Sequence, residues 1–345
     1  MGLKIKTPLG NFEIRPYRPG DEEAILASWK AAFGKEMSRK EWQWKYPSNP
    51  EGFRCLLCIA EDGTVAVHYA AQVHRVFWKE REILALHLTD SFSHPRFRGA
   101  LGLKKGLFVR TGQIFLKTFL EKIDLPAKPL PIKAPLAQFH YGFPGERHFK
   151  LGLRLLNYRA HRPGVLYFQG APLKHKPRLS WRYKIEEALL EKDALGEELS
   201  CFFTEFRHKV STFALIRDQR FLEWRFTRPN RKYKIFYLKT FWHKKIKAWI
   251  IIEERKRLRI LDFLAFEPKE LALLLSFVLS KIKKPAEVWL SGNHPLKEAF
   301  KGPVFSRAPE PLGIIPNTGC DFANDFWRFE DGDKFFFTMA DADLF

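Results

Sequence analysis

The stretch 94–108, HPRFRGALGLKKGLF, separates two apolar segments of different character. The segment before it, ILALHLTD at 83–90, is typical of a buried strand, and the segment from 107 onward has the apolar spacing of a helix. Glycines and cations therefore stand where a strand passes into a helix. Backbone N–H groups at a helix N-terminus bind anions, and glycine lets the backbone approach a phosphate. The stretch predicts an anion-binding loop, although an Arg-Gly turn by itself also fits an ordinary turn.

The segments around this loop follow a defined order. Ser38-Arg39-Lys40-Glu41 is a capping box that predicts the start of a helix. The elements that we expect are a strand at 12–17, helices from 21 and from 38, strands at 53–60, 65–78 and 83–92, a helix at 106–121, a strand at 136–141, a helix at 146–156 and a strand at 158–168. Antiparallel strands followed by a β-α-β crossover predict an α+β protein with helices covering a mixed sheet.

The second half of the chain repeats this pattern but not its residues. The elements expected there are strands at 232–241, 245–253 and 258–266, a helix at 268–279, a strand at 286–290 and a short helix at 294–300. The order β-β-β-α-β-α thus occurs twice. We expect a first domain at 1–168, a connector at 169–201 and a second lobe at 202–345.

Two runs of the first domain resemble the GNAT superfamily of acyl-CoA N-acyltransferases. They are DSFSHPRFRG at 90–99, which resembles that family's D-x-x-V-x-P-x-x-R-G run, and YGFP at 141–144. The resemblance covers roughly residues 10–168, and it departs from the family at Leu101, where a second glycine is expected. It implies a mixed-sheet GNAT-like acyltransferase fold with a second, degenerate lobe. It also implies acetyl-CoA, or another acyl-CoA, as co-substrate, and a primary amine as acceptor.

The resemblance assigns roles to residues near the loop. The fourth strand would pair with the pantetheine arm of coenzyme A, and the loop would surround the pyrophosphate. The cofactor-binding residues that it implies are Phe92, Ser93, Arg98, Gly99, Gly102, Lys104, Lys105 and Gly106.

The catalytic groups are less defined. Amine acylation needs a base for the amine proton and an acid near the leaving thiolate. Members of the family often have a tyrosine in the helix after the fifth strand, and Leu153 occupies the corresponding position here. The candidates that remain in this region are Asp90, His140, Tyr141, Glu146 and His148.

The second lobe lacks the loop. Its strand-to-helix passage, LDFLAFEPKE at 261–270, has glutamates in place of glycines and cations, so we expect it to repel pyrophosphate. The aromatic and acidic tail at 335–345 has two interpretations. Asp341 and Asp343 could meet an amine substrate, or the aromatic terminus could pack into the core.

Bulk composition limits the partners. The formal net charge is +20, from 59 Lys and Arg against 39 Asp and Glu, which favours anionic partners such as a phosphorylated cofactor or an anionic surface. Cys55 and Cys58 lie in an apolar strand-like run without a second pair at a zinc-ribbon spacing, so we expect no metal site. The start of the chain has no secretory pattern and no apolar run is long enough for a membrane span, so we expect a cytoplasmic protein.

The function expected from these observations is an acyl-CoA-dependent N-acetyltransferase whose acceptor is a small amine or an amino sugar. A catalytically inactive bilobal CoA-binding or scaffold protein is the alternative. A basic nucleic-acid-binding protein is the second alternative, suggested by the basic aromatic run at 232–239. No helix-turn-helix, zinc-finger or RNP pattern supports it, so we expect no nucleic-acid partner.

Overall fold

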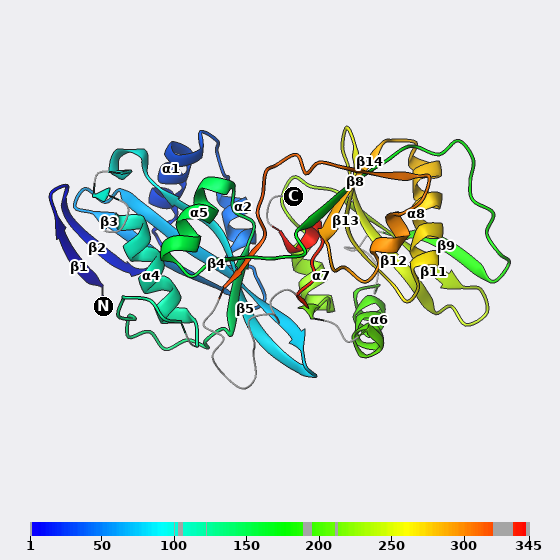
Figure 1. The fold of residues 1–345 in the computed structure, drawn as a ribbon, viewed down its shortest axis with the longest axis horizontal. Coiled ribbons are helices and arrows are strands. Elements are labelled where there is room, and N and C mark those ends of the chain that lie inside the picture. The colour runs from blue at the N-terminus through cyan, green and yellow to red at the C-terminus, as the bar shows by residue number, and fades with distance from the viewer. Residues whose placement is uncertain are drawn as a thin grey trace. The chain divides into compact units, whose positions relative to one another are not determined.

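The computed structural model describes residues 2–99, 101–102, 106–121, 123–188, 195–210, 213–319 and 334–342. The chain forms two compact α+β units, which Figure 1 shows as a ribbon. Unit 1 consists of Met1–Arg75, Ile83–His161 and Ile314–Gly332. Unit 2 consists of Val76–Glu82, Arg162–Gly313 and Asp333–Phe345. The chain therefore passes between the units several times.

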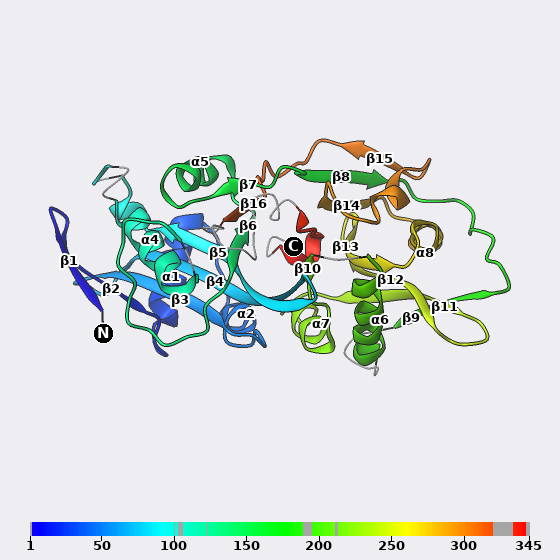
Figure 2. The same cartoon turned by 60° about the horizontal axis from the view of Figure 1, so that its bottom comes forward.

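The sheet of unit 1 is mixed. Its strands follow the order β1-β2-β3-β4-β5-β6-β16-β7, and β5 and β6 are parallel. The bounds are β1 Leu3–Thr7, β2 Gly10–Pro16, β3 Phe53–Ala60, β4 Val65–Trp78, β5 Arg81–Ser93, β6 Phe139–Gly142, β7 Arg159–Ala160 and β16 Asn317–Gly319. Figure 2 shows β16 beside β6 and β7.

Helices cover both faces of this sheet. They are α1 Glu22–Phe33, α2 Arg39–Lys45, α4 Leu107–Phe119 and α5 Glu146–Leu155, with the short helix η1 at Pro95–Phe97. Tyr69 of β4 packs in one apolar cluster with α4 and α5, whereas its neighbour Ala70 packs with α1 and α2, because successive strand residues point to opposite faces. The predicted cap is confirmed: the Ser38 hydroxyl accepts a hydrogen bond from the Glu41 N–H at 3.1 Å.

Unit 2 contains the second mixed sheet. The order of its strands is β15-β8-β14-β13-β12-β11-β9, and the pair β10–β4 lies at the end of the β4–β5 hairpin. The strands of this sheet are β8 Val165–Gly170, β9 Tyr183–Ala188, β11 Tyr233–Thr240, β12 Ile246–Glu254, β13 Leu258–Ala265, β14 Ala286–Ser291 and β15 Phe305–Ala308. The short strand β10, Ala214–Leu215, pairs with β4 and so belongs to the first sheet. The helices are α6 Leu195–Val210, α7 Gln219–Arg225 and α8 Pro268–Ile282, with η2 at Lys297–Phe300 and η4 at Met339–Asp341.

The predicted β-β-β-α-β pattern of the second half is confirmed in β11, β12, β13, α8 and β14. The basic aromatic run at 232–239 is mostly β11, and its aromatic side chains Tyr233, Phe236 and Tyr237 are buried. These rings are core residues and not a stacking surface for bases.

The structure differs from the sequence-based expectation where the two halves meet. The single strand expected at 158–168 is two strands, β7 and β8, which belong to different sheets. Pro163 and Gly164, the latter with φ of 61°, break the extended backbone between them. In addition, β9 and part of α6 lie within the predicted connector, and β16 returns to the sheet of unit 1. The compact units therefore do not follow the expected bounds 1–168 and 202–345.

Three further observations concern the cysteines, metal-ligating side chains and membrane-spanning helices. Cys55 and Cys58 are buried in β3, where burial raises the pKa of the Cys58 thiol to about 12. Among the described residues, no three His, Cys, Asp or Glu side chains are grouped closely enough to hold a metal ion. No helix in the described part of the chain has the length and apolar content needed to cross a bilayer.

Candidate active site

The parallel pair β5–β6 is short. Its register joins Ala85 to Phe139, Leu86 to His140 and His87 to Tyr141, whereas β5 continues to Ser93. The backbone of β5 changes course at Asp90, whose φ is 49°. The end of β5 therefore extends beyond its pairing with β6 and leads into the loop at 94–106.

A cavity of about 740 Å³ lies at this end of β5. Its wall combines five parts of unit 1, namely α1, the end of β5, the loop, and the first turns of α4 and of α5. The lining residues are Phe33, Ser91, Phe92, Ser93, Phe97, Arg98, Gly99, Leu101, Gly102, Gly106, Leu107, Phe108, Val109, Gly145, Glu146, Arg147, His148 and Leu151.

The loop has the backbone form that its glycines predict. Gly99 and Gly102 have φ of 74° and 69°, and a Cβ atom at either position would meet no atom within 4 Å. The left-handed conformation, not crowding, therefore requires glycine here. The Arg98 guanidinium donates to the carbonyl oxygens of Ser93 at 3.0 Å and Ala32 at 3.2 Å, which holds it at the mouth of the loop. The expected ligands Lys104 and Lys105 lie outside the described residues.

Two helix N-termini meet the cavity. Gly106 and Gly145 are the N-cap residues of α4 and α5, and neither has a side chain that can cap the first N–H groups. Both glycines line the cavity. The partial positive charge of each helix N-terminus favours an anion. Arg98 and Arg147 add formal positive charge to the same wall.

His148 is a half-buried titratable group in the cavity wall. Its ring lies 5.4 Å from Phe108 and 5.7 Å from Tyr158, measured between ring centroids. Its Nε2 is 3.4 Å from the Tyr158 hydroxyl, which is in turn 2.9 Å from the Tyr69 hydroxyl. Burial lowers the pKa of His148 to about 4, so its imidazole is neutral at pH 7 and one ring nitrogen can accept a proton.

Glu146 stands at the exposed rim. Its carboxylate is 67% exposed and lies 2.6 Å from the Lys150 ammonium, and this hydrogen bond lowers its pKa. Glu146 is therefore ionised at neutral pH. It places one negative charge among the cations of the rim.

The other three catalytic candidates do not line this cavity. The Asp90 carboxylate pairs with the Lys45 ammonium at 2.6 Å and accepts a hydrogen bond from the Tyr46 hydroxyl at 2.9 Å. His140 is fully buried, and burial lowers its pKa to about 3. The Tyr141 hydroxyl lies 2.6 Å from His74 Nδ1. Asp90 and Tyr141 are therefore bound to neighbouring side chains of unit 1, and His140 is enclosed by it.

Sequence spacing placed the equivalent of the family tyrosine at Leu153. That side chain is 54% exposed and lines a separate hollow with Gln113 and Asn157. The hydroxyl pair Tyr158–Tyr69 was not expected. Gly152 is the sequence feature that marks it, because a Cβ atom there would lie 2.1 Å from the Tyr158 ring, so α5 needs glycine where the ring crosses it.

Unit 2 has an equivalent parallel strand pair, β13–β14, but a segment of the chain itself occupies the ends of these strands. The register of this pair joins Leu258 to Ala286 and Arg259 to Glu287, and β13 continues to Ala265. The C-terminal segment 335–342 bonds to both strands beyond that register. Thr338 Oγ1 donates to the Asp262 carboxylate of β13 at 2.9 Å, and the Ser291 N–H of β14 donates to the Phe337 carbonyl at 3.0 Å.

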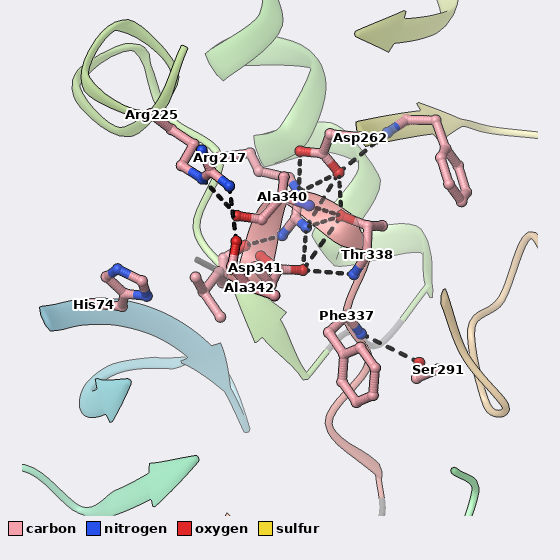
Figure 3. Close-up of polar contacts among 12 residues, drawn as sticks. His74, Arg217, Arg225, Asp262, Ser291, Phe337, Thr338, Ala340, Asp341 and Ala342 are labelled. Carbon is pink, nitrogen blue, oxygen red and sulfur yellow. Dashed lines mark hydrogen bonds and ion pairs between the residues drawn. The ribbon is translucent and has the colours of Figure 1, made fainter. Parts of the chain in front are cut away.

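Two buried arginines hold this segment, as Figure 3 shows. Arg217 forms ion pairs with Asp262 at 3.0 Å and with Asp341 at 2.7 Å, and all three side chains are at most 1% exposed. Arg225 donates to the carbonyl oxygens of Ala340 and Ala342 at 2.7 and 2.8 Å. Asp341, which belongs to the packed tail, is therefore bound by Arg217 within unit 2. Asp343 lies outside the described residues.

Comparisons with known proteins place this architecture. No protein-family model and no curated protein sequence matches the chain. Solved structures do match over 89% of it. It is similar to a conserved protein of unknown function from Enterococcus faecalis (12% identity, 71% of that chain, TM-score 0.64) and to a GCN5-related N-acetyltransferase from Anabaena variabilis (12% identity, 72% of that chain, TM-score 0.62).

A third similar structure is a tandem GNAT protein from the clavulanic acid biosynthesis pathway (11% identity, 89% of this chain and 98% of that chain, TM-score 0.52). At these identities the likeness establishes the fold. It confirms the mixed-sheet GNAT-like fold with two lobes that the sequence predicted.

Proposed function

We propose that the chain is an acyl-CoA-dependent N-acyltransferase that transfers an acetyl group from acetyl-CoA to a primary amine. The observation that carries the proposal is the cavity at the end of β5, where the glycine loop and the N-termini of α4 and α5 meet. A bound acyl-CoA would supply an acyl group activated as a thioester. The GNAT-like fold supports this choice over other anionic ligands.

The residues of the cavity fit the parts of coenzyme A. Arg98 can bind a phosphate through two N–H groups, and Gly99, Gly102 and Gly106 let backbone N–H groups approach a diphosphate. Phe92 and Ser93 line the wall at the end of β5, where a pantetheine arm would run along the strand. The neutral walls contributed by Leu107, Phe108 and Leu151 would exclude water from the acyl end.

His148 and Glu146 have the chemistry that the acceptor needs. A neutral imidazole in the wall can accept the proton that the amine loses as it forms the amide. The Tyr158 hydroxyl at Nε2 orients the ring. The ionised Glu146 carboxylate at the rim attracts a cationic amine. We propose His148 as the general base and Glu146 as an acceptor-binding residue.

Binding is tested by thermal unfolding with acetyl-CoA. A ligand at about a hundred times its Kd stabilises the folded chain by about 2.7 kcal/mol, so the melting temperature should rise. Arg98→Glu should abolish the rise. Arg96→Glu is the matched control, because Arg96 is in the same loop but pairs with Asp62 and does not line the cavity. An unchanged melting temperature of the native chain at millimolar acetyl-CoA would contradict the proposal.

Catalysis is tested by the release of free CoA thiol with a panel of small amines and amino sugars. His148→Gln should lower kcat by about 10²- to 10⁴-fold without loss of the acetyl-CoA-dependent stabilisation. Stabilisation without thiol release for any acceptor would instead support the inactive CoA-binding alternative.

A further inference from the structure

A cluster of exposed aromatic and cationic side chains lies at one end of the sheet of unit 2, on the segment that precedes β9 and on the turn between β11 and β12. We define the aromatic tip as Leu179, Trp181, Phe241 and Trp242. Their exposed fractions are 37%, 69%, 55% and 71%. Large apolar side chains exposed together mark interaction surfaces, whereas single ones are ordinary.

Backbone pairing holds the two segments of the tip together. Thr240 is the register partner of Tyr183, and the Phe241 N–H donates to the Arg182 carbonyl at 2.8 Å. The Phe241 and Trp242 rings lie 5.4 Å apart at 85°. The Arg182 guanidinium lies 5.4 Å from the centre of the Trp181 ring. Figure 2 shows the start of β9 and the β11–β12 turn at this same end of the sheet.

The charge around the tip has one sign. Residues 171–184 contain five Lys and Arg and no Asp or Glu, and residues 239–247 contain four and none. Acidic groups of neighbouring segments neutralise part of this charge: Glu186 pairs with Lys184, Glu198 with Lys239 and Glu205 with Lys245. Within the described ranges, Arg178, Arg182 and Lys244 have no carboxylate within ion-pair distance.

We propose that the aromatic tip docks unit 2 on an anionic lipid surface, with Trp181 and Trp242 at the headgroup level and the surrounding cations on lipid phosphates. Tryptophan favours the membrane–water interface because its ring is apolar and its N–H is polar. Clustered Lys and Arg add electrostatic attraction to anionic lipids. Leu179 adds an aliphatic side chain, which favours an acyl boundary over the stacked bases of a nucleic acid. This docking is independent of the proposed acyl transfer in unit 1.

The test is flotation of the full chain with vesicles of phosphatidylcholine alone and with vesicles that also contain phosphatidylglycerol. The native chain should bind only the anionic vesicles, and more weakly as salt increases. The double variant Trp181→Ala, Trp242→Ala should lose about tenfold or more of its affinity. Leu312→Ala is the apolar control, because Leu312 is 52% exposed but lies outside the tip.

Charge reversal gives the second arm. Arg178→Glu with Arg182→Glu should weaken vesicle binding by about 25-fold or more, from about fivefold for each cation lost at the surface. Lys232→Glu is the charge control, since Lys232 is exposed and precedes β11 at the opposite end of that strand. Lipids with brominated acyl chains should quench the native fluorescence, and the variant Trp181→Phe, Trp242→Phe should lose that quenching.

Several results would overturn the proposal. They are equal binding to neutral vesicles, no binding at low salt, or full binding by the tryptophan variant. The proposal would also be overturned if the tryptophan variant lost affinity for random single-stranded DNA but not for vesicles, because the tip would then bind nucleic acid. It would equally be overturned if the variant abolished a dimer that the native chain forms in solution, because the tip would then bind a second copy of this chain.

Discussion

The parallel strand pairs β5–β6 of unit 1 and β13–β14 of unit 2 correspond to each other, but what lies at their ends differs. In unit 1, β5 extends beyond its register with β6 and ends at a cavity lined by glycines and helix N-termini. In unit 2, β13 extends beyond its register with β14, and the C-terminal segment bonds to both strands there. The comparison teaches that strand order alone does not make a ligand site. The loop after the strand and the segment that covers the strand end decide whether a ligand can enter.

The segments that lead from these strands into the next helix, α4 or α8, also differ in their residues. Gly99, Gly102 and Gly106 precede α4, whereas Glu267 is the N-cap of α8 and is followed by Pro268. We therefore retain the prediction that unit 2 does not bind acetyl-CoA. Either the charge of this passage or the packed tail can be responsible, and variants of each distinguish the two.

The largest effect is expected from Arg217→Ala. The variant leaves the carboxylates of Asp262 and Asp341 buried without their cation, which should lower the free energy of unfolding by about 3–5 kcal/mol. Urea unfolding measures it. Arg225→Ala is the comparison variant, because it removes the hydrogen bonds to the neutral carbonyl groups of Ala340 and Ala342 and should cost less. An equal cost for both variants would show that the ion pairs do not hold the tail.

Gly152→Ala should affect unit 1 through packing. The new Cβ atom would lie 2.1 Å from the Tyr158 ring, so the ring must move, at a cost of about 1–3 kcal/mol. The displacement should also separate Tyr158 from His148 and lower kcat without a matching change in acetyl-CoA binding. Gly145→Ala, at the N-cap of the same helix, meets no atom within 4 Å and should change stability by less. Wild-type stability in Gly152→Ala would argue against this packing.

His140 should make unit 1 sensitive to acid. Its pKa falls from about 6.5 in the unfolded chain to about 3 in the folded one. Between these values the unfolded chain binds a proton that the folded chain does not. Stability is therefore full above pH 6.5 and decreases by up to about 1.4 kcal/mol per pH unit below it. Urea unfolding at several pH values should show a smaller decrease in His140→Phe, while exposed His175→Gln should behave as the native chain does.

The smallest effect is expected from giving unit 2 the loop chemistry of unit 1. In the Arg98→Glu background, Glu267→Gly with Glu270→Gln should produce no heat of acetyl-CoA binding in calorimetry, because the C-terminal segment still occupies the strand ends. Measurable binding would show that charge, and not the tail, distinguishes the two units.

Local patterns predicted most elements of the fold, and long-range pairing explains what they did not predict. The apolar runs of β11 to β13, the apolar face of α4 and the Ser38 cap are encoded within short windows, and the structure contains all three. The transfer of β8 to the second sheet and of β16 to the first depends on partners more than a hundred residues away. The spacing of apolar residues within a short window cannot indicate a partner so far away in the sequence.

The candidate site, too, could be predicted from the sequence only in part. Gly99 and Gly102 could be chosen from sequence because a left-handed backbone limits the residue type. The five catalytic candidates could not be ranked, because burial and pairing separate them. Lys45 binds Asp90 from a helix 45 residues earlier, and His148 differs from His140 mainly by its place in the cavity wall.

The alternation of the chain between its units has a consequence for synthesis on the ribosome. The sheet of unit 1 lacks β16 until residue 319 has emerged, and the strand ends of unit 2 lack their cover until the tail at 335–342 follows. A nascent chain stopped near residue 170 would carry β8 without β14, the neighbour it pairs with, and would expose an unpaired edge prone to aggregation. Neither half is therefore a sound choice for separate expression, and both should complete their folding only after the tail has emerged.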